Sequence, residues 1–347
     1  MRLLILGGTG FVGPHLARVA LDLGHEVTLF HRGRTALPLD LAGRRGLDEL
    51  RGDRDPRDPS GAGGLGALEG DRRWDACVDL SGYVPRLVGA SAELLADRVG
   101  TYLFVSSISV YALPIAPGAD EDAPVATMDD PTDEEIGADY GALKALCEDR
   151  VRAALGERAL VVRPGLIVGP GDPTDRFSYW PLAAAEATGR ELLCPGTPAD
   201  PAHVIDARDL ARSMVELCAA GTAGTYNASG PTQAFTMGEL VDGCLAGTGS
   251  AATPVWVPAG FLAEHEVLPW VHMPGWIPPD HEAAGMCSVS LDRAFAAGLA
   301  CRPLADTARD TLDWLREDRK AREDPTLRAG IPPERAAELL EAWRARA

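Results

Sequence analysis

The first thirteen residues constrain the fold of this chain more than any other stretch. Four apolar residues, Leu3 to Leu6, are too few for a helix and run into glycines at positions 7, 10 and 13, after which apolar residues recur at helical spacing. This order predicts a buried parallel strand, a tight turn and a helix. The glycines suit a dinucleotide, because they allow the turn, a close approach of backbone to a pyrophosphate, and packing of helix on strand. The pyrophosphate would lie at the helix N-terminus, where unpaired N–H groups favour negative charge. The expected contacts are Gly7, Thr9, Gly10, Phe11, Val12 and Gly13.

The end of the second expected strand, at residues 25–30, bears on which dinucleotide would bind. An acidic side chain at this position binds the ribose 2′-hydroxyl of NAD, whereas basic side chains accommodate the 2′-phosphate of NADP. Here the sequence is His31-Arg32-Gly33-Arg34, without a carboxylate. The stretch therefore favours NADP(H), with NAD(H) as the alternative. Asp53, just past an expected third strand, would lie near the adenine.

A fourth strand is expected at residues 74–80, after a loop at 51–73 with at most a short helix. The turn Ser81-Gly82-Tyr83 would line the cofactor, because ligands of open α/β sheets bind beyond the carboxyl ends of the strands. A helix at 85–99 and a fifth strand at 101–105 are expected to follow.

Serines and a tyrosine–lysine pair come after the fifth strand. Ser106, Ser107 and Ser109 follow it directly, and Tyr140 and Lys144 lie four residues apart, on one face of an expected helix. A nearby ammonium would lower the pKa of the phenol, which could then exchange a proton near neutral pH. A serine hydroxyl would hold the substrate oxygen in line. This spacing alone is common on helix surfaces, and it gains meaning from the glycine-rich turn that precedes it.

In this order the motifs resemble the extended short-chain dehydrogenase/reductases. The matching segments are Gly7-x-x-Gly10-x-x-Gly13, Val105-Ser106-Ser107-x-x-Val110-Tyr111, Tyr140-x-x-x-Lys144 and Val162-Arg163-Pro164-x-x-Ile167-x-Gly169-Pro170. Residues 206–211 and 224–227 also look like the later helix and strand of the family. The resemblance implies that Tyr140 is the acid/base, that Lys144 binds the nicotinamide ribose and that Ser107 orients the substrate, with Ser106 as a substitute. It also implies that Pro164 lies beside the carboxamide.

One position departs from family members that act on nucleotide sugars. Those members often carry an arginine for the diphosphate about seven residues before Asp209, where this chain has Ala202. Arg176 could replace it, and Arg176 and Ser109 are therefore candidate substrate contacts together with Ser107. An acidic segment at 119–135 discourages polyanionic substrates, although a solvated loop is the favoured interpretation of that segment.

The chain looks most similar to a branch of the family related to chloroplast stem-loop RNA-binding proteins, which have lost the tyrosine and the lysine. Both residues remain here, and a net charge of −18 opposes binding to nucleic acid and to anionic membranes. Seven scattered cysteines without a C-x-x-C pair indicate reduced thiols, and the histidines lack the spacing of a metal site. We therefore expect a cytoplasmic enzyme with a small-molecule substrate and no metal.

The expected fold is a Rossmann-type, doubly wound parallel α/β sheet with a smaller C-terminal substrate lobe. The sheet domain would span residues 1–178, with a strand and helix returning at about 200–230, the lobe 179–330, and an amphipathic helix 331–347. Trp256, Trp270 and Trp276 could line a pocket or anchor the core of the lobe. A homodimer through the helix that carries Tyr140 would use Leu143, Leu146 and Val151.

These features predict hydride transfer between NADP(H) and a carbonyl or secondary alcohol of a small substrate that is not a polyanion. One alternative is an epimerase or dehydratase of a sugar or nucleotide sugar that recycles its cofactor. The other is a non-catalytic relative that binds the cofactor or RNA.

Overall fold

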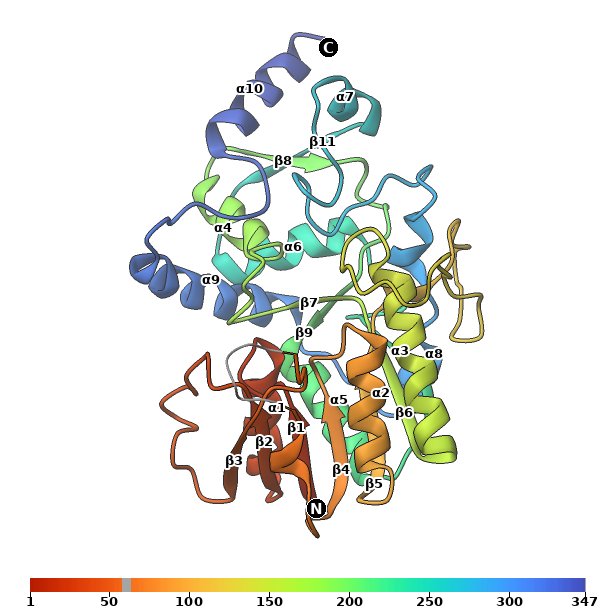
Figure 1. Ribbon diagram of the computed structural model, residues 1–347. Helices are drawn as coiled ribbons and strands as arrows, with labels where there is room; N and C mark the ends of the chain where they lie inside the picture. The colour runs from red at the N-terminus through yellow and green to blue at the C-terminus, as the bar shows by residue number, and fades with distance from the viewer. Residues whose placement is uncertain (58–63, 347) are drawn as a thin grey trace.

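The computed structural model describes residues 1–57 and 64–346, and its centre is a parallel sheet (Figure 1). Within these residues the sheet has seven strands in the order β10-β6-β5-β4-β1-β2-β3. The strands are β1 (Arg2–Leu6), β2 (Glu26–His31), β3 (Leu47–Arg51), β4 (Trp74–Asp79), β5 (Val99–Val105), β6 (Ala159–Pro164) and β10 (Gly224–Ala228). Every neighbouring pair is parallel. The predicted Rossmann-type α/β fold is confirmed.

Helices cover both faces of the sheet, which explains the unbroken apolar run of β1. Leu3 and Ile5 point to the face covered by α1 (Val12–Asp22) and α5 (Ala207–Ala219). Leu4 and Leu6 point to the opposite face, covered by α2 (Pro85–Leu95) and α3 (Tyr140–Leu155). All four side chains of this strand are fully buried.

Several element boundaries differ from those expected. α2 ends at Leu95 rather than near residue 99, because Val99 already pairs with Trp74 at the start of β5. The loop between β3 and β4 holds a short 3₁₀ helix, Gly66–Leu68, and residues 58–63 of the expected loop lie outside the described part of the chain.

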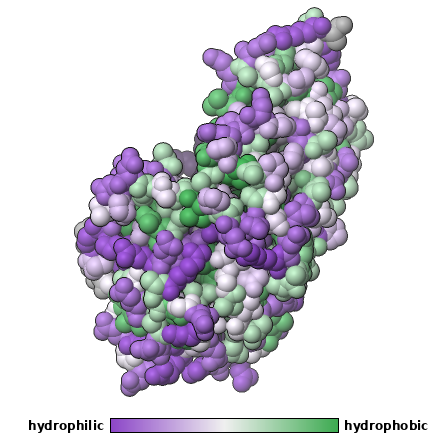
Figure 2. Space-filling view, turned by 90° about the vertical axis from the view of Figure 1, so that its right-hand side faces the viewer, coloured by the Kyte–Doolittle hydropathy of each residue, from purple (hydrophilic) through white to green (hydrophobic). Residues whose placement is uncertain are grey.

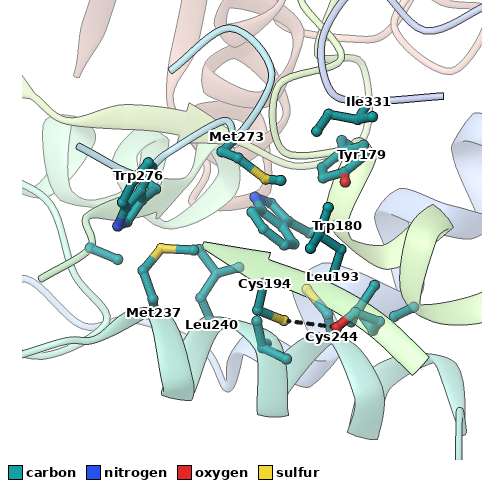
Figure 3. Close-up of a cluster of buried hydrophobic side chains, with 14 of the residues drawn as sticks. Tyr179, Trp180, Leu193, Cys194, Met237, Leu240, Cys244, Met273, Trp276 and Ile331 are labelled. Carbon is teal, nitrogen blue, oxygen red and sulfur yellow. Dashed lines mark hydrogen bonds between the residues drawn. The ribbon is translucent and has the colours of Figure 1, made fainter. Parts of the chain in front are cut away.

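A lobe with its own core follows the sheet. It contains α4 (Tyr179–Glu186), α6 (Met237–Thr248), α7 (Ala259–Glu264), α9 (Leu304–Ala321) and α10 (Pro333–Arg344), with the paired strands β8 (Glu191–Pro195) and β11 (Thr253–Val257). The short strands β7 (Leu166–Val168) and β9 (Val204–Asp206) join it to the sheet, and α8 (Asp292–Ala296) packs near β10. Trp180, Met237, Leu240 and Trp276 pack together in its core (Figure 3).

The predicted C-terminal helix corresponds to α10, which buries Leu339 and Leu340 in the core of the lobe. Of the three apolar positions expected at a dimer interface, Leu146 is half-buried and the other two are fully buried. Leu143 and Val151 are fully buried inside the chain, so they are not available to a second copy.

Six of the seven cysteines are buried and all are free thiols. Within residues 1–57 and 64–346, no group of side chains has the composition of a metal site, and no helix is long and apolar enough to cross a membrane.

Candidate active site

A cavity of about 1620 Å³ lies at the carboxyl ends of β1, β2, β4 and β5, between the sheet and the lobe. We call the residues contributed by the sheet and its helices the sheet wall: Gly7, Thr9, Gly10, Phe11, Val12, Gly13, His31, Arg32, Arg34, Asp53, Arg54, Ser81, Tyr83, Ser106, Ser107, Ser109, Tyr140 and Lys144. The facing residues form the lobe wall: Gly165, Leu166, Ile167, Asp172, Pro173, Thr174, Arg176, Leu268, Pro269, Trp270, Val271, Ile277, His281, Ala283 and Met286. Most of the predicted site residues therefore share one cavity.

Each of the three glycines at the first turn is required, or leaves space, for a different structural reason. Gly7 has a φ of +88°, which favours glycine, and its N–H donates to the carbonyl of Phe30. A Cβ on Gly13 would lie 2.4 Å from the backbone of Gly8, so only glycine lets the helix approach the turn. A Cβ on Gly10 would meet nothing closer than 4.0 Å, so this glycine leaves space rather than filling a contact.

Two arginines stand at the end of β2. Arg32 is exposed, and no other described residue pairs with its guanidinium, whereas Arg34 lies 3.7 Å from the carboxylate of Asp53. His31 is buried, and both of its ring nitrogens are engaged, since Nδ1 accepts from the Gly33 N–H and Nε2 contacts Glu49 at 2.9 Å. Arg32 rather than His31 is therefore the group at this position that an anion could meet.

A buried ion pair at this wall was not anticipated from the sequence. The Arg54 guanidinium donates to both oxygens of Asp79, at 2.8 and 2.7 Å, and the Tyr102 hydroxyl donates to the same carboxylate at 2.9 Å. Arg54 also contacts the hydroxyl of Ser81 at 3.3 Å. The pair thus fixes the turn after β4. Its only sequence signal was a charged residue, Asp79, directly after the apolar residues 76–78 of β4.

Lys144 is anchored by backbone rather than by an acid. Its Nζ donates to the carbonyls of Gly82, at 2.8 Å, and Val105, at 2.6 Å, and burial lowers its pKa to about 8. Two of its three N–H donors are thus used, and one is left for a ligand. Gly82 contributes this carbonyl but does not line the cavity.

Tyr140 begins α3, and its pKa is raised above the ordinary value. Burial is the main cause, and the nearby Tyr83 adds to it, while the Ser107 hydroxyl and the charge of Arg176 oppose it. The expectation that Lys144 lowers the pKa of this phenol is therefore wrong for the protein by itself, because desolvation outweighs the favourable neighbours. Ser107 also donates to Ser109 at 3.1 Å, and the Ser106 hydroxyl is buried without a partner among the described residues.

A second buried network holds α3 against the sheet. Arg163 donates to both oxygens of Glu148, at 2.9 and 2.7 Å, and to the carbonyl of Glu121 at 3.0 Å. Glu121, from the acidic segment, is itself buried and accepts from the backbone of Asn227. The interpretation of that whole segment as a solvated loop is thus wrong at Glu121. Pro164 is buried beside Arg163, and its neighbour Gly165 lines the cavity instead.

The lobe wall presents Arg176 on a rigid loop. Asp175, with a φ of +57°, is fully buried and pairs with Arg322 at 2.7 and 2.8 Å, which holds the loop in place. The Arg176 guanidinium lies 5.9 Å from the ring centre of Trp270. Of the three tryptophans considered for a pocket, only Trp270 lines this cavity, since Trp276 is buried in the core and Trp256 packs against it.

A family of known proteins matches the part of the chain that contains the glycine turn of the sheet wall. Residues 3–55 match the model of the NAD dependent epimerase/dehydratase family. A putative epimerase from Burkholderia cenocepacia J2315 superposes with a TM-score of 0.65 and 22% identity, over 91% of this chain and 98% of that one. The chain thus has the fold of this epimerase, and its first strands match the NAD dependent epimerase/dehydratase model. A second structure of the same fold, a UDP-glucuronic acid 4-epimerase from Bacillus cereus in complex with NAD, has a TM-score of 0.61 and 16% identity, over 91% of this chain and 99% of that one.

The curated relatives that this chain resembles have different functions. The 41 kDa chloroplast stem-loop binding protein b of Arabidopsis thaliana is 27% identical over 62% of this chain, and the match spans 54% of that protein. A dTDP-4-dehydro-6-deoxy-D-allose reductase of Streptomyces bikiniensis is 28% identical over 66% of this chain and 76% of its own length. A 2-alkyl-3-oxoalkanoate reductase of Stenotrophomonas maltophilia (strain K279a) is 31% identical over 50% of this chain and 52% of its own length. The matches to the first and third relatives thus span about half the length of those proteins.

Proposed function

We propose that this protein is an NADP(H)-dependent oxidoreductase that interconverts a carbonyl and a secondary alcohol. The observation that carries the proposal is that one cavity joins the glycine turn, at Gly7 to Gly13, with Ser107, Tyr140 and Lys144. A cofactor site alone would need only the first group. The second group places a proton donor, an orienting hydroxyl and a cation next to it.

The residues present fit a nicotinamide dinucleotide. The open space at Gly10 and the start of α1 suit a pyrophosphate, and Asp53 and Ser81 line the adjacent wall. Arg32 and Arg34 would hold the 2′-phosphate of NADP, because no carboxylate follows β2 directly. The remaining N–H of Lys144 would bind the nicotinamide ribose. Bound NADPH would supply the hydride for a reduction.

Tyr140 suits the proton that accompanies this hydride. Since the pKa of its phenol is raised, the hydroxyl is protonated at neutral pH and can donate to a developing alkoxide. Ser107, which lowers that pKa, lies beside it and would orient the substrate oxygen. Lys144, with a pKa of about 8, is mainly cationic at neutral pH and would favour the phenolate formed after donation.

An epimerase or dehydratase with recycled cofactor would use the same residues. Two similar proteins motivate this second candidate: the Bacillus cereus epimerase in complex with NAD and the nucleotide-sugar reductase of Streptomyces bikiniensis. The buried alanine at position 202 argues against a diphosphate ligand there, because the side chain is fully buried and uncharged. The plant stem-loop binding relative motivates a third candidate, RNA binding, which the net charge of −18 opposes.

One experiment separates these candidates. The purified protein is denatured, any released dinucleotide is identified by mass, and NADPH and NADH are titrated into nucleotide-free protein. A reductase is expected to release little nucleotide and to bind NADPH more tightly than NADH. Near-stoichiometric release of NAD⁺ would favour the recycling enzyme. Absence of any nucleotide binding would contradict both, and RNA affinity that falls steeply with salt would then support the third candidate.

A further inference from the structure

The cavity mouth is unusually apolar for the surface of so acidic a chain. Seven large hydrophobic side chains are exposed among the described residues, and four of them line this one cavity. They are Tyr83, Ile136, Leu268 and Val271, each between 45% and 54% exposed. Hydrophobic residues also gather on the face shown in Figure 2, near the junction of the sheet-bearing part and the lobe. Exposed apolar groups that cluster in this way mark a binding surface rather than a random pattern.

The lobe wall contributes one arginine. No described residue accepts a hydrogen bond from the Arg176 guanidinium, which lies on the Trp270 ring, and Trp270 itself has a φ of +61°. A bulky residue in the left-handed region costs free energy and persists where the surroundings impose it. Arg176 is fixed from behind as well, because Arg328 donates to the carbonyl of Pro173 and Arg322 pairs with Asp175. The cation is therefore positioned before any ligand arrives.

Neighbouring charges leave this cation available. Asp172 is buried, and its Oδ1 accepts from the backbone and the hydroxyl of Thr174, while its Oδ2 has no partner among the described residues. Burial raises the pKa of Asp172 above its ordinary value. His281, also on this wall, accepts a hydrogen bond from the Ala283 N–H at Nδ1. Glu134 of the acidic segment is paired with Arg86 and Arg57 and does not contact Arg176.

We propose that the lobe wall binds an amphipathic monocarboxylic acid, the carboxylate pairing with Arg176 and the apolar chain lying on Trp270, Leu268 and Val271 toward the mouth. This inference rests on the proposed function and names its substrate class, an oxo acid or hydroxy acid with a hydrocarbon chain. One guanidinium matches one carboxylate, whereas a diphosphate would meet only this one cation on the lobe wall. The carbonyl of the same molecule would lie at Tyr140, which lines the same cavity as Arg176.

The test compares acids with uncharged analogues of equal length. The probes are 3-oxo acids of six, eight and ten carbons and their methyl esters, assayed with NADPH. The acids are expected to be turned over with a kcat/KM at least tenfold above that of the esters, increasing severalfold for each pair of added carbons. Arg176→Gln should lower kcat/KM for the acids at least tenfold more than for the esters, which removes the preference for the acid. Leu268→Gln with Val271→Thr should flatten the dependence on chain length. Arg316→Gln, an exposed residue of α9, is the matched control for the lost charge.

Binding supplies a readout that does not need turnover. Decanoate and methyl decanoate are titrated into protein saturated with NADP⁺, and decanoate is expected to bind at least tenfold more tightly in the wild type but not in Arg176→Gln. Equal binding of acid and ester, or an unchanged preference in Arg176→Gln, would overturn the inference. Reduction of uncharged carbonyls that depends on Tyr140 would then leave the proposed function intact. Loss of NADPH binding in the wild type would instead contradict the proposed function itself.

Discussion

Two arginines of the cavity, Arg54 on the sheet wall and Arg176 on the lobe wall, differ in burial and in pairing. Arg54, on the sheet wall, is buried and forms a bidentate ion pair with Asp79, which is itself fully buried. The guanidinium of Arg176, on the lobe wall, donates to no described residue and lies against an aromatic ring. Arg54 stabilises the turn after β4, whereas the guanidinium N–H groups of Arg176 make no hydrogen bond to a described residue. The comparison shows that an arginine of this cavity can be a fixed part of the fold, as Arg54 is, or can keep its guanidinium donors unused by the described residues, as Arg176 does.

Replacing each arginine in turn tests whether the two contribute differently to the stability of the fold. Arg54→Leu should lower the free energy of unfolding by about 3–5 kcal/mol, because the carboxylate of Asp79 is left buried and uncompensated. Arg176→Gln should lower it by less than about 1 kcal/mol, because the guanidinium makes only a cation–π contact with Trp270 at 5.9 Å. Urea denaturation followed by fluorescence measures both. Equal losses would show that Arg176 is as structural as Arg54.

The buried ammonium of Lys144 is expected to lower the free energy of unfolding at neutral pH. Its pKa of about 8 in the folded protein lies below the ordinary value of 10.5, so the folded state releases this proton first. Folding is therefore penalised below pH 8, and the penalty is relieved as the pH rises from 8 to 10.5. Relative to Lys144→Met, the wild type should gain up to about 3 kcal/mol over that interval. Urea titrations of both proteins at several pH values measure the difference, and a difference independent of pH would contradict the shifted pKa.

Two glycines of one turn should respond differently to the same added methyl group. Gly13→Ala should destabilise the fold by about 1–3 kcal/mol, since its Cβ would overlap the backbone of Gly8. Gly10→Ala should change stability by less than about 0.5 kcal/mol but weaken NADPH binding, because its Cβ would fill space left for the ligand. Thermal unfolding and NADPH titration together separate the two effects. Unchanged affinity in Gly10→Ala would place the pyrophosphate elsewhere.

The smallest expected effect concerns the choice of cofactor. Arg32→Gln should weaken NADPH binding about tenfold and leave NADH binding unchanged, because the exposed guanidinium would contact only the 2′-phosphate. Fluorescence titration with both nucleotides measures the ratio. Parallel losses for the two nucleotides would show that Arg32 supports the turn rather than the phosphate.

The sheet wall could be predicted from the sequence because its parts are local. Gly7 to Gly13 form one turn, and Tyr140 and Lys144 lie one helical turn apart, so spacing in the chain is spacing in the structure. The Arg54–Asp79 pair could not be predicted, because a contact between residues that follow or end two different strands produces no periodic pattern in the sequence. The pKa of Tyr140 was predicted in the wrong direction, since sequence shows a neighbouring lysine but not the extent of burial.

The lobe wall could be predicted only in outline. Arg176 and Trp270 are separated by more than ninety residues of chain, and their contact depends on the loop that Arg322 fixes through Asp175. The packing of Leu143 and Val151 inside the chain likewise depends on how α3 lies against its neighbours, which apolar spacing alone does not show.

The most direct test of the central claim is the turnover of Tyr140→Phe. This change removes one hydroxyl and keeps the ring. We expect NADPH affinity within twofold of the wild type and a fall in kcat of at least about a hundredfold with any reduced carbonyl. The shared cavity would then be both a cofactor site and a proton-transfer site. Full turnover in Tyr140→Phe, with the cofactor bound, would contradict the assignment of Tyr140 and the enzyme mechanism built on it.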